Sequence, residues 1–205
     1  MFSGKRLLTH KKEWNNMKKE KTIALITASA LFLGACSQSD NHTTTSNHQK
    51  DSHQGTIALK EVKTKPEDAI KKAQNSYKNQ QVTEISFEKS NGEWVYKVEQ
   101  QNPQNHNESE VIVNDKSQRV EHKKSEKGDQ DHSDDQDTFK YSEVKSYKSA
   151  IKAAQRAFDG EIKEWSLSKD DGKLVYDITL QKDKEQRDIT VDAQTGKVID
   201  NQQDD

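Results

Sequence analysis

Cysteine is the residue that this 205-residue chain uses least, because Cys36 is the only one. A lone cysteine excludes an intramolecular disulfide and any zinc or redox site built on a cysteine pair. Apolar residues are also scarce: they make up 29% of the chain, against 33% charged residues. This composition is too polar for one large core, and it is typical of small domains joined by solvated linkers.

Catalytic motifs and a basic charge excess are absent as well. The sequence contains no His-Glu-x-x-His, no Gly-x-Ser-x-Gly, no P-loop and no dinucleotide fingerprint. Its formal net charge of -2 gives no indication of nucleic-acid binding. We therefore expect a protein that is not an enzyme, that has no evident small-molecule substrate and that does not bind nucleic acid.

The longest apolar run is TIALITASALFLGA, which covers residues 22–35 and leads directly into Cys36. It is shorter than the roughly 20 residues that a membrane-spanning helix needs. Lysines 18, 19 and 21 precede it. A basic start, an apolar centre and small residues at the exit are typical of a secretory signal peptide. The sequence predicts such a signal over residues 17–35.

The exit of this run, Leu33-Gly34-Ala35-Cys36, resembles the lipobox of bacterial lipoproteins. The resemblance implies that the Cys36 thiol receives a diacylglyceryl group and that cleavage leaves Cys36 as the first residue. Fatty acyl chains such as palmitate contribute about 0.8 kcal/mol per buried methylene, so two of them anchor a protein stably. We expect this lipid in place of any cofactor, at the extracytoplasmic face of the cell membrane. An ordinary secreted protein and a signal-anchor helix are the alternatives.

Residues 1–16 do not fit a short signal peptide, and they are expected to precede the true start at Met17. The codons of Lys12-Glu13-Trp14 can contain a ribosome-binding sequence just before the Met17 codon. An N-terminal extension is the alternative. From Cys36 onward the chain keeps 26 Lys and Arg against 33 Asp and Glu, a net charge of -7, because residues 1–35 hold seven basic and two acidic residues. Attachment to an anionic membrane must then come from the lipid.

A duplication follows the polar segment 36–56, which reads as a lipidated flexible tether. We expect two domains, at residues 57–121 and 139–201, separated by an acidic linker at 122–138. The matched residues are Glu61-Val62-Lys63 with Glu143-Val144-Lys145, Ala69-Ile70 with Ala150-Ile151, and Gly92 and Tyr96 with Gly172 and Tyr176.

Each unit predicts one helix followed by an antiparallel sheet. Thr64 and Glu67 have the spacing of a capping box, and Ser146 can cap the second helix. Asn91-Gly92 and Asp171-Gly172 stand between alternating apolar runs, which favours hairpins with type I′ turns. The predicted fold class is α+β, with two tandem small domains of one helix on a three- to four-stranded sheet each.

The order of helix, Asp-Gly hairpin, Tyr-bearing strand and TVDAQTGKVI, residues 190–199, resembles the PepSY domain. In this motif Asp192, Thr195 and Gly196 predict a turn with a left-handed residue. The first unit is a degenerate copy, with Asn114 and Gln118 at the positions of Asp192 and Gly196. The resemblance implies a non-catalytic module that binds and restrains a protease or another envelope protein.

The leading hypothesis is a surface lipoprotein, of a Gram-positive bacterium, that binds protein through two PepSY-like modules. The expected recognition surface is the sheet face opposite the helix, or the loop at residues 100–109. One alternative is an envelope protein that binds zinc or calcium through His42, His48 and His53, or through His132 and its neighbouring aspartates. A structural spacer is the other alternative.

Overall fold

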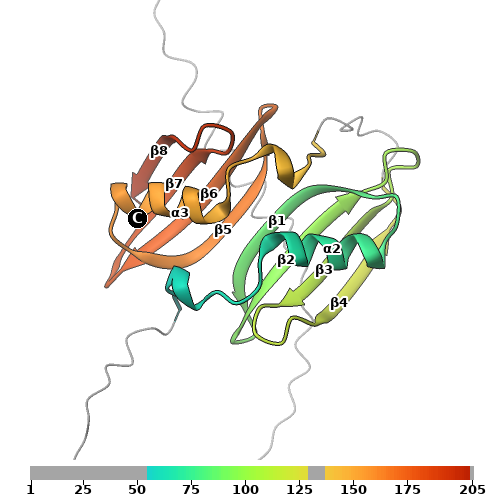
Figure 1. The fold of residues 1–205 in the computed structure, drawn as a ribbon, viewed down its shortest axis with the longest axis horizontal. Coiled ribbons are helices and arrows are strands. Elements are labelled where there is room, and N and C mark those ends of the chain that lie inside the picture. The colour runs from blue at the N-terminus through green and yellow to red at the C-terminus, as the bar shows by residue number, and fades with distance from the viewer. Residues whose placement is uncertain (1–54, 129–136, 204–205) are drawn as a thin grey trace, which may run out of the picture. The chain divides into compact units, whose positions relative to one another are not determined.

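The computed structural model describes residues 55–128 and 137–203. Within these ranges each repeat contains a 3₁₀ turn, an α-helix and four strands in the same order (Figure 1). The elements of the first repeat are η1 (Leu59–Glu61), α2 (Pro66–Ser76), β1 (Gln81–Ser90), β2 (Glu93–Gln101), β3 (Glu108–Asn114) and β4 (Val120–Glu126). Those of the second are η2 (Tyr141–Glu143), α3 (Tyr147–Ala157), β5 (Glu161–Asp170), β6 (Lys173–Lys182), β7 (Glu185–Asp192) and β8 (Val198–Gln203).

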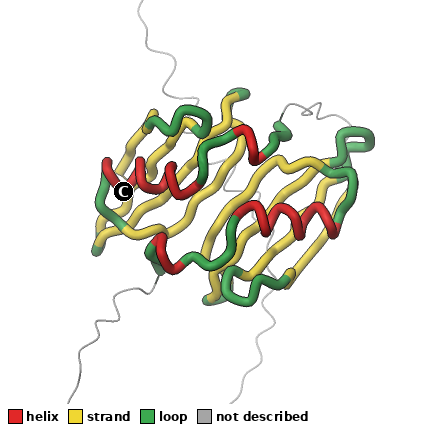
Figure 2. Tube along the Cα trace, viewed as in Figure 1, coloured by secondary structure: helices red, strands yellow, loops and turns green. Residues whose placement is uncertain are grey.

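The eight strands form a single antiparallel sheet in the order β4-β3-β2-β1-β5-β6-β7-β8. The α+β class is confirmed, but the prediction of two separate sheets is wrong, because β1 pairs with β5 at the centre (Figure 2). Without this pairing both strands would be apolar edges with unpaired N–H and C=O groups. Ser86 lies opposite Ser166, its counterpart in the other repeat, so an approximate twofold axis passes between these two residues.

The segment that precedes each helix also pairs with the other repeat. Ile57 and Ile162 exchange two backbone hydrogen bonds of 2.8 and 3.1 Å. In the same way the Phe139 N–H donates to the Val82 carbonyl oxygen over 2.9 Å. In each repeat the segment before the helix, here called its arm, therefore pairs with the first strand of the other repeat. The two arms are exchanged about the approximate twofold axis.

Both helices lie on one face of the sheet, α2 over β1–β3 and α3 over β6–β8 (Figure 1). The predicted apolar stripes face the sheet: Ala69, Ile70 and Ala73 are buried, as are their counterparts in α3. Ser146 caps α3 as predicted, because its side chain accepts from the Ser149 N–H. The predicted capping box at the start of α2 is wrong, because the N-cap residue of this helix makes no side-chain hydrogen bond.

The capping box fails because the Thr64 side chain is used elsewhere. Its hydroxyl donates to the Asp115 carbonyl oxygen over 2.6 Å, and its own N–H donates to the Asp115 carboxylate over 2.7 Å. Lys65 occupies the N-cap position without a side-chain hydrogen bond. Asp115 thus ties the entry of α2 to the end of β3, so a contact that is distant in sequence replaces the local cap.

One aromatic cluster fills the core on both sides of the β1–β5 junction. Trp165 on β5 is 1% exposed, and its ring lies 6.3 Å from that of Phe87 on β1 and 6.0 Å from that of Tyr96 on β2. It also packs against Tyr147 of α3 and Tyr176 of β6, at 5.6 and 5.9 Å. A unit of about 60 residues buries only a modest core by itself, so the shared cluster stabilises both repeats.

The predicted hairpin turns are confirmed, whereas two predicted boundaries are wrong. Asn91 and Gly92 have φ values of 50° and 84°, and Asp171 and Gly172 have values of 48° and 75°, as a type I′ turn requires. The predicted loop at 100–109 shortens to residues 102–107, because its ends pair within β2 and β3. Residues 122–126, predicted as linker, belong to β4, because their backbone pairs with β3 although their side chains are polar.

Candidate functional site

The sheet face opposite α2 and α3, here called the open face, is the larger candidate surface. Among the described residues, no helix packs against it. Strand alternation places polar side chains on it from both repeats, since the neighbours of inward-facing Tyr96 and Tyr176 point the other way. The open face comprises Glu84, Ser86, Lys97, Glu99, Glu110, Ser166, Asp177, Thr179, Asp188 and Thr190.

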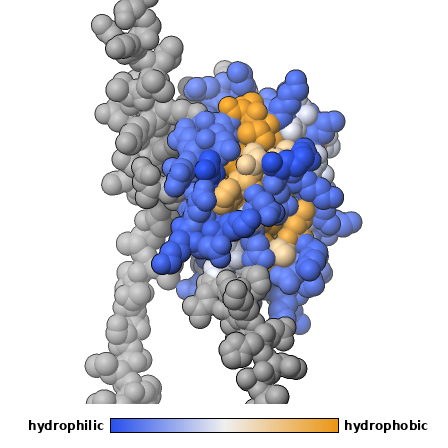
Figure 3. Space-filling model, turned by 90° about the vertical axis from the view of Figure 1, so that its left-hand side faces the viewer, coloured by the Kyte–Doolittle hydropathy of each residue, from blue (hydrophilic) through white to orange (hydrophobic). Residues whose placement is uncertain are grey.

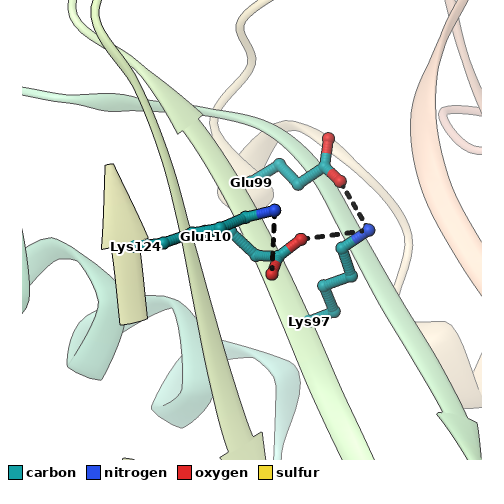
Figure 4. Close-up of polar contacts among 4 residues, drawn as sticks. All are labelled: Lys97, Glu99, Glu110 and Lys124. Carbon is teal, nitrogen blue, oxygen red and sulfur yellow. Dashed lines mark ion pairs between the residues drawn. The ribbon is translucent and has the colours of Figure 1, made fainter. Parts of the chain in front are cut away.

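On the first repeat this face carries an ion-pair network across β2, β3 and β4 (Figure 4). The Lys97 Nζ lies 2.8 Å from Glu99 and 3.2 Å from Glu110, and Glu110 also pairs with Lys124 at 3.6 Å. Partial burial opposes the charge on Lys97, but attraction and hydrogen bonds from Glu99 and Glu110 outweigh it and raise the Lys97 pKa. The network fixes these four side chains in one arrangement.

On the second repeat the corresponding positions carry acids and hydroxyls instead of this network. The Thr179 hydroxyl donates to Asp188, and the Thr190 hydroxyl donates to Asp177, each over 2.8 Å. Asp177 stands at the position of Lys97, and Asp188 at that of Glu110, so the second repeat has a carboxylate where the first has a lysine. Carboxylates that are oriented by neighbouring hydroxyls suit a basic partner surface.

Asp192, Thr195 and Gly196 lie together in the β7–β8 turn. One Asp192 carboxylate oxygen accepts from the Thr195 N–H and hydroxyl, both over 2.7 Å, and from the Gln194 N–H over 3.2 Å. These hydrogen bonds, first that of the Thr195 N–H, lower the Asp192 pKa. Gly196 has a φ of +74°. The three residues shape the chain, and nothing in this geometry assigns them a ligand.

The first repeat keeps the same turn with different residues. The Asn114 side-chain oxygen accepts from the Ser117 N–H over 2.8 Å, as Asp192 accepts from Thr195. Gln118 takes the place of Gly196 and adopts a φ of +58°, which is unusual for a residue with a side chain. The substitutions that make this copy degenerate therefore preserve its backbone.

The tyrosine that matches between the repeats has a structural role that the sequence did not reveal. The Tyr96 hydroxyl donates to the Thr64 carbonyl oxygen, and the Tyr176 hydroxyl donates to that of Lys145, both over 2.8 Å. Each bond fixes the segment that enters a helix. Burial raises the pKa of both tyrosines above the ordinary value, so neither is suited to lose its proton. The sequence hinted at this shared role only through the matched positions of the two tyrosines in the repeats.

The two outer strands expose different side chains. On β8, Val198 and Ile199 are 37% and 57% exposed, and Figure 3, seen from the left of Figure 1, shows apolar surface bordered by polar residues. On β4, Val120 is exposed, and two lysines follow it, at positions 123 and 124. Charged side chains of this kind protect an edge strand from pairing with other chains.

Several predicted site residues lie outside the described residues. These are the lipidation residue Cys36, the lipobox residues Leu33, Gly34 and Ala35, and the histidines His42, His48, His53 and His132. In the described ranges 55–128 and 137–203, no cluster of three or more His, Cys, Asp or Glu side chains is placed to hold a metal ion. No helix in these ranges has both the length and the apolar character to cross a membrane.

A hollow beside α2 was not anticipated. It has a volume of about 380 Å³, and its lining residues are Glu67 and Ile70 of α2 with Tyr141, Ser142, Val144 and Ser146. Its walls come from both repeats, because the segment that enters α3 lies against the first turn of α2. No sequence signal pointed to it, since the contact depends on the pairing of β1 with β5.

Comparison with known proteins identifies the repeats. The family described as peptidase propeptide and YPEB domain (PepSY) matches residues 65–121 and 144–201. The crystal structure of a candidate lipoprotein from Clostridium difficile 630 is similar, with a TM-score of 0.66 and 26% sequence identity, over 73% of this chain and 99% of that one. The comparison with curated proteins gives no match. Since the two PepSY matches cover more than half of the sequence, the chain belongs to the PepSY family and carries two tandem PepSY domains.

Proposed function

We propose that this protein is a lipid-anchored binding protein of the extracytoplasmic membrane face. In this proposal its tandem PepSY domains bind a protease or another envelope protein and modulate its activity. The observation that carries the proposal is the PepSY match in both repeats, because the family description itself names peptidase propeptides. A propeptide acts by contact with a folded protein, so a binding role fits better than catalysis.

The lipid anchor is supported by two independent observations. The sequence LFLGAC places a single cysteine at the end of an apolar run, with small residues directly before it. The similar Clostridium difficile structure is that of a candidate lipoprotein. Two acyl chains on Cys36 would hold the chain at the membrane, and the polar residues that follow would let the domains reach away from it.

The open face supports the binding role through its chemistry. Its side chains are mostly carboxylates and hydroxyls on a hydrogen-bonded sheet, so they are held in place before a partner arrives. The chain from Cys36 onward has a net charge of -7, which speeds association with a basic surface. We therefore expect a partner with a basic contact surface.

Two experiments test the proposal. Metabolic labelling with a palmitate analogue should mark the wild-type protein and should fail with Cys36→Ala, which should also move from the membrane to the medium. The purified full-length protein should bind at least one secreted or envelope protease and change its rate of substrate cleavage. No lipid incorporation would contradict the anchor, and no binding with unchanged protease activity would contradict the modulatory role.

A further inference from the structure

The hollow beside α2 combines an apolar wall with one negative charge. Its lining consists of Glu67, Ile70, Tyr141, Ser142, Val144 and Ser146. Ile70 and Val144 supply aliphatic carbon, Tyr141 supplies an aromatic ring, and the two serines supply hydroxyls. Glu67 is the one charged side chain of the six. The hollow lies on the helix side of the sheet, away from the open face.

Glu67 has no ion pair among the residues that the structure describes. Lys71 lies one helical turn further on, a spacing that commonly allows an ion pair, yet it forms none with Glu67. The Glu67 charge nevertheless acts on the lining. Burial chiefly raises the pKa of Tyr141 and Tyr147, and the Glu67 charge adds to both shifts. The carboxylate is an exposed anion that lines the same hollow as Tyr141.

The pairing of a carboxylate with a tyrosine occurs at only one of the two positions that the approximate twofold symmetry relates. In the two eleven-residue helices, Ile70 corresponds to Ile151, and Glu67 corresponds to Lys148. In the segments that enter them, Tyr141 corresponds to Leu59 and Ser142 to Lys60. The second set therefore has two lysines and no aromatic ring where the first has a carboxylate and a tyrosine. A hollow needed for packing alone would not require opposite charges in the two halves.

We propose that the hollow beside α2 binds the side chain of a lysine or an arginine on a protein partner. The aliphatic stem of that side chain would lie against Ile70 and Val144, as such stems do on apolar surface. Its cationic end would meet the Glu67 carboxylate and the Tyr141 ring, a pairing of charge and aromatic face that favours Lys and Arg. This second contact site is independent of the open face, and it adds to the preference for a basic partner.

The test uses small probes that mimic the two side chains. The full-length protein, in detergent micelles and with labelled Tyr rings and Ile and Val methyl groups, is titrated with n-butylammonium and with n-butylguanidinium in an NMR experiment. n-Butanol is the control with the same stem and no charge. We expect saturable shifts at Tyr141, Ile70 and Val144 with both cations, and much weaker ones with butanol.

Three variants separate the pocket from general attraction to an acidic protein. Glu67→Gln should weaken cation binding about fivefold. Ser142→Lys, at an exposed position, should weaken it by placing a cation at the rim. Lys148→Gln, the matched change in α3, should leave it unaltered. Variant spectra that match those of the wild type away from the hollow will show that each variant is folded.

Each outcome bears on the proposal directly. Shifts spread over surface carboxylates, or a Glu67→Gln protein that binds the cations as well as the wild type does, would overturn it. Binding that is equally strong for butanol would show an apolar pocket and would overturn it too. Cation binding in the hollow together with an unaltered protease would support this inference while contradicting the proposed function. Altered protease activity without cation binding in the hollow would contradict this inference and would leave the proposed function supported.

Discussion

The ring of Trp165 on β5 packs against that of Phe87 on β1, with centroids 6.3 Å apart and planes inclined by 26°. These two residues face each other directly in the strand pairing that joins the repeats. They therefore make one core of two PepSY domains, and this contact has measurable consequences for stability.

Trp165→Ala should destabilise both repeats together. The substitution leaves a large cavity at the junction, and comparable changes cost about 3–5 kcal/mol in the free energy of unfolding. Urea unfolding, followed by NMR signals from each repeat, should give one transition at a lower midpoint. A first repeat that unfolds at its wild-type midpoint would show that the cores are separate. A double-mutant cycle with Phe87→Ala should give a coupling of about 0.5–1.5 kcal/mol.

Tyr96→Phe and Tyr176→Phe should each reduce stability by about 1–2 kcal/mol, because each leaves a carbonyl oxygen without its donor. The loss at Tyr176 should be at least as large as that at Tyr96, because the Tyr176 hydroxyl also forms a hydrogen bond with Tyr141. Tyr77→Phe is the matched control, because its hydroxyl has no hydrogen bond to any residue within 55–128 or 137–203. Its effect should stay below about 0.5 kcal/mol. Denaturant melts at constant pH measure all three. Equal effects at Tyr77 and Tyr96 would argue against the role of these bonds.

Exchanging residues between the β3–β4 turn and the β7–β8 turn should lower stability at position 196 and should not lower it at position 118. Gly196→Gln places a side chain at a φ of +74° and should cost about 1 kcal/mol. Gln118→Gly removes a side chain at +58° and should leave stability unchanged or raise it. Thermal melts of the two variants against the wild type provide the comparison. A loss of stability with Gln118→Gly would mean that its side chain makes a contact that outweighs backbone strain.

Asp192→Asn should remove part of the acid sensitivity of the fold. The Asp192 pKa is lowered by its hydrogen bonds, so the carboxylate stabilises the folded state above its unfolded pKa, near 4, and loses this effect as the pH falls through its folded pKa. The wild type should therefore exceed the variant in stability at pH 7, and the difference should shrink below pH 4. A difference that is constant from pH 7 to pH 2 would contradict this.

The sequence predicted features that depend on near neighbours in the chain. The apolar stripes of both helices, the Ser146 cap and the Asn91-Gly92 hairpin follow from local spacing and turn chemistry. The β1–β5 pairing did not follow, because an apolar edge strand shows no preference for its partner in the sequence. The prediction of a capping box at Thr64 was wrong because Asp115, which lies 51 residues away, binds that segment instead.

The candidate surfaces were predictable to different degrees. The open face follows from strand alternation, and its acidic character can be read from Asp177 and Asp188 once the strands are placed. The pocket at Glu67 and Tyr141 could not be found in this way, because it joins residues from different repeats. Its walls exist only where the exchanged arms bring the second repeat against α2.

The most direct test of the binding role is photo-crosslinking on intact cells from the open face. A photoreactive residue at the exposed position Asp177 is compared with one at Arg156, which is exposed on α3 and lies outside the hollow beside α2. We predict that the probe at 177 captures a protease or another envelope protein and that the probe at 156 does not. The captured protein should change in activity when this chain is removed. Capture of no protein at position 177, or equal capture at both positions, would contradict it.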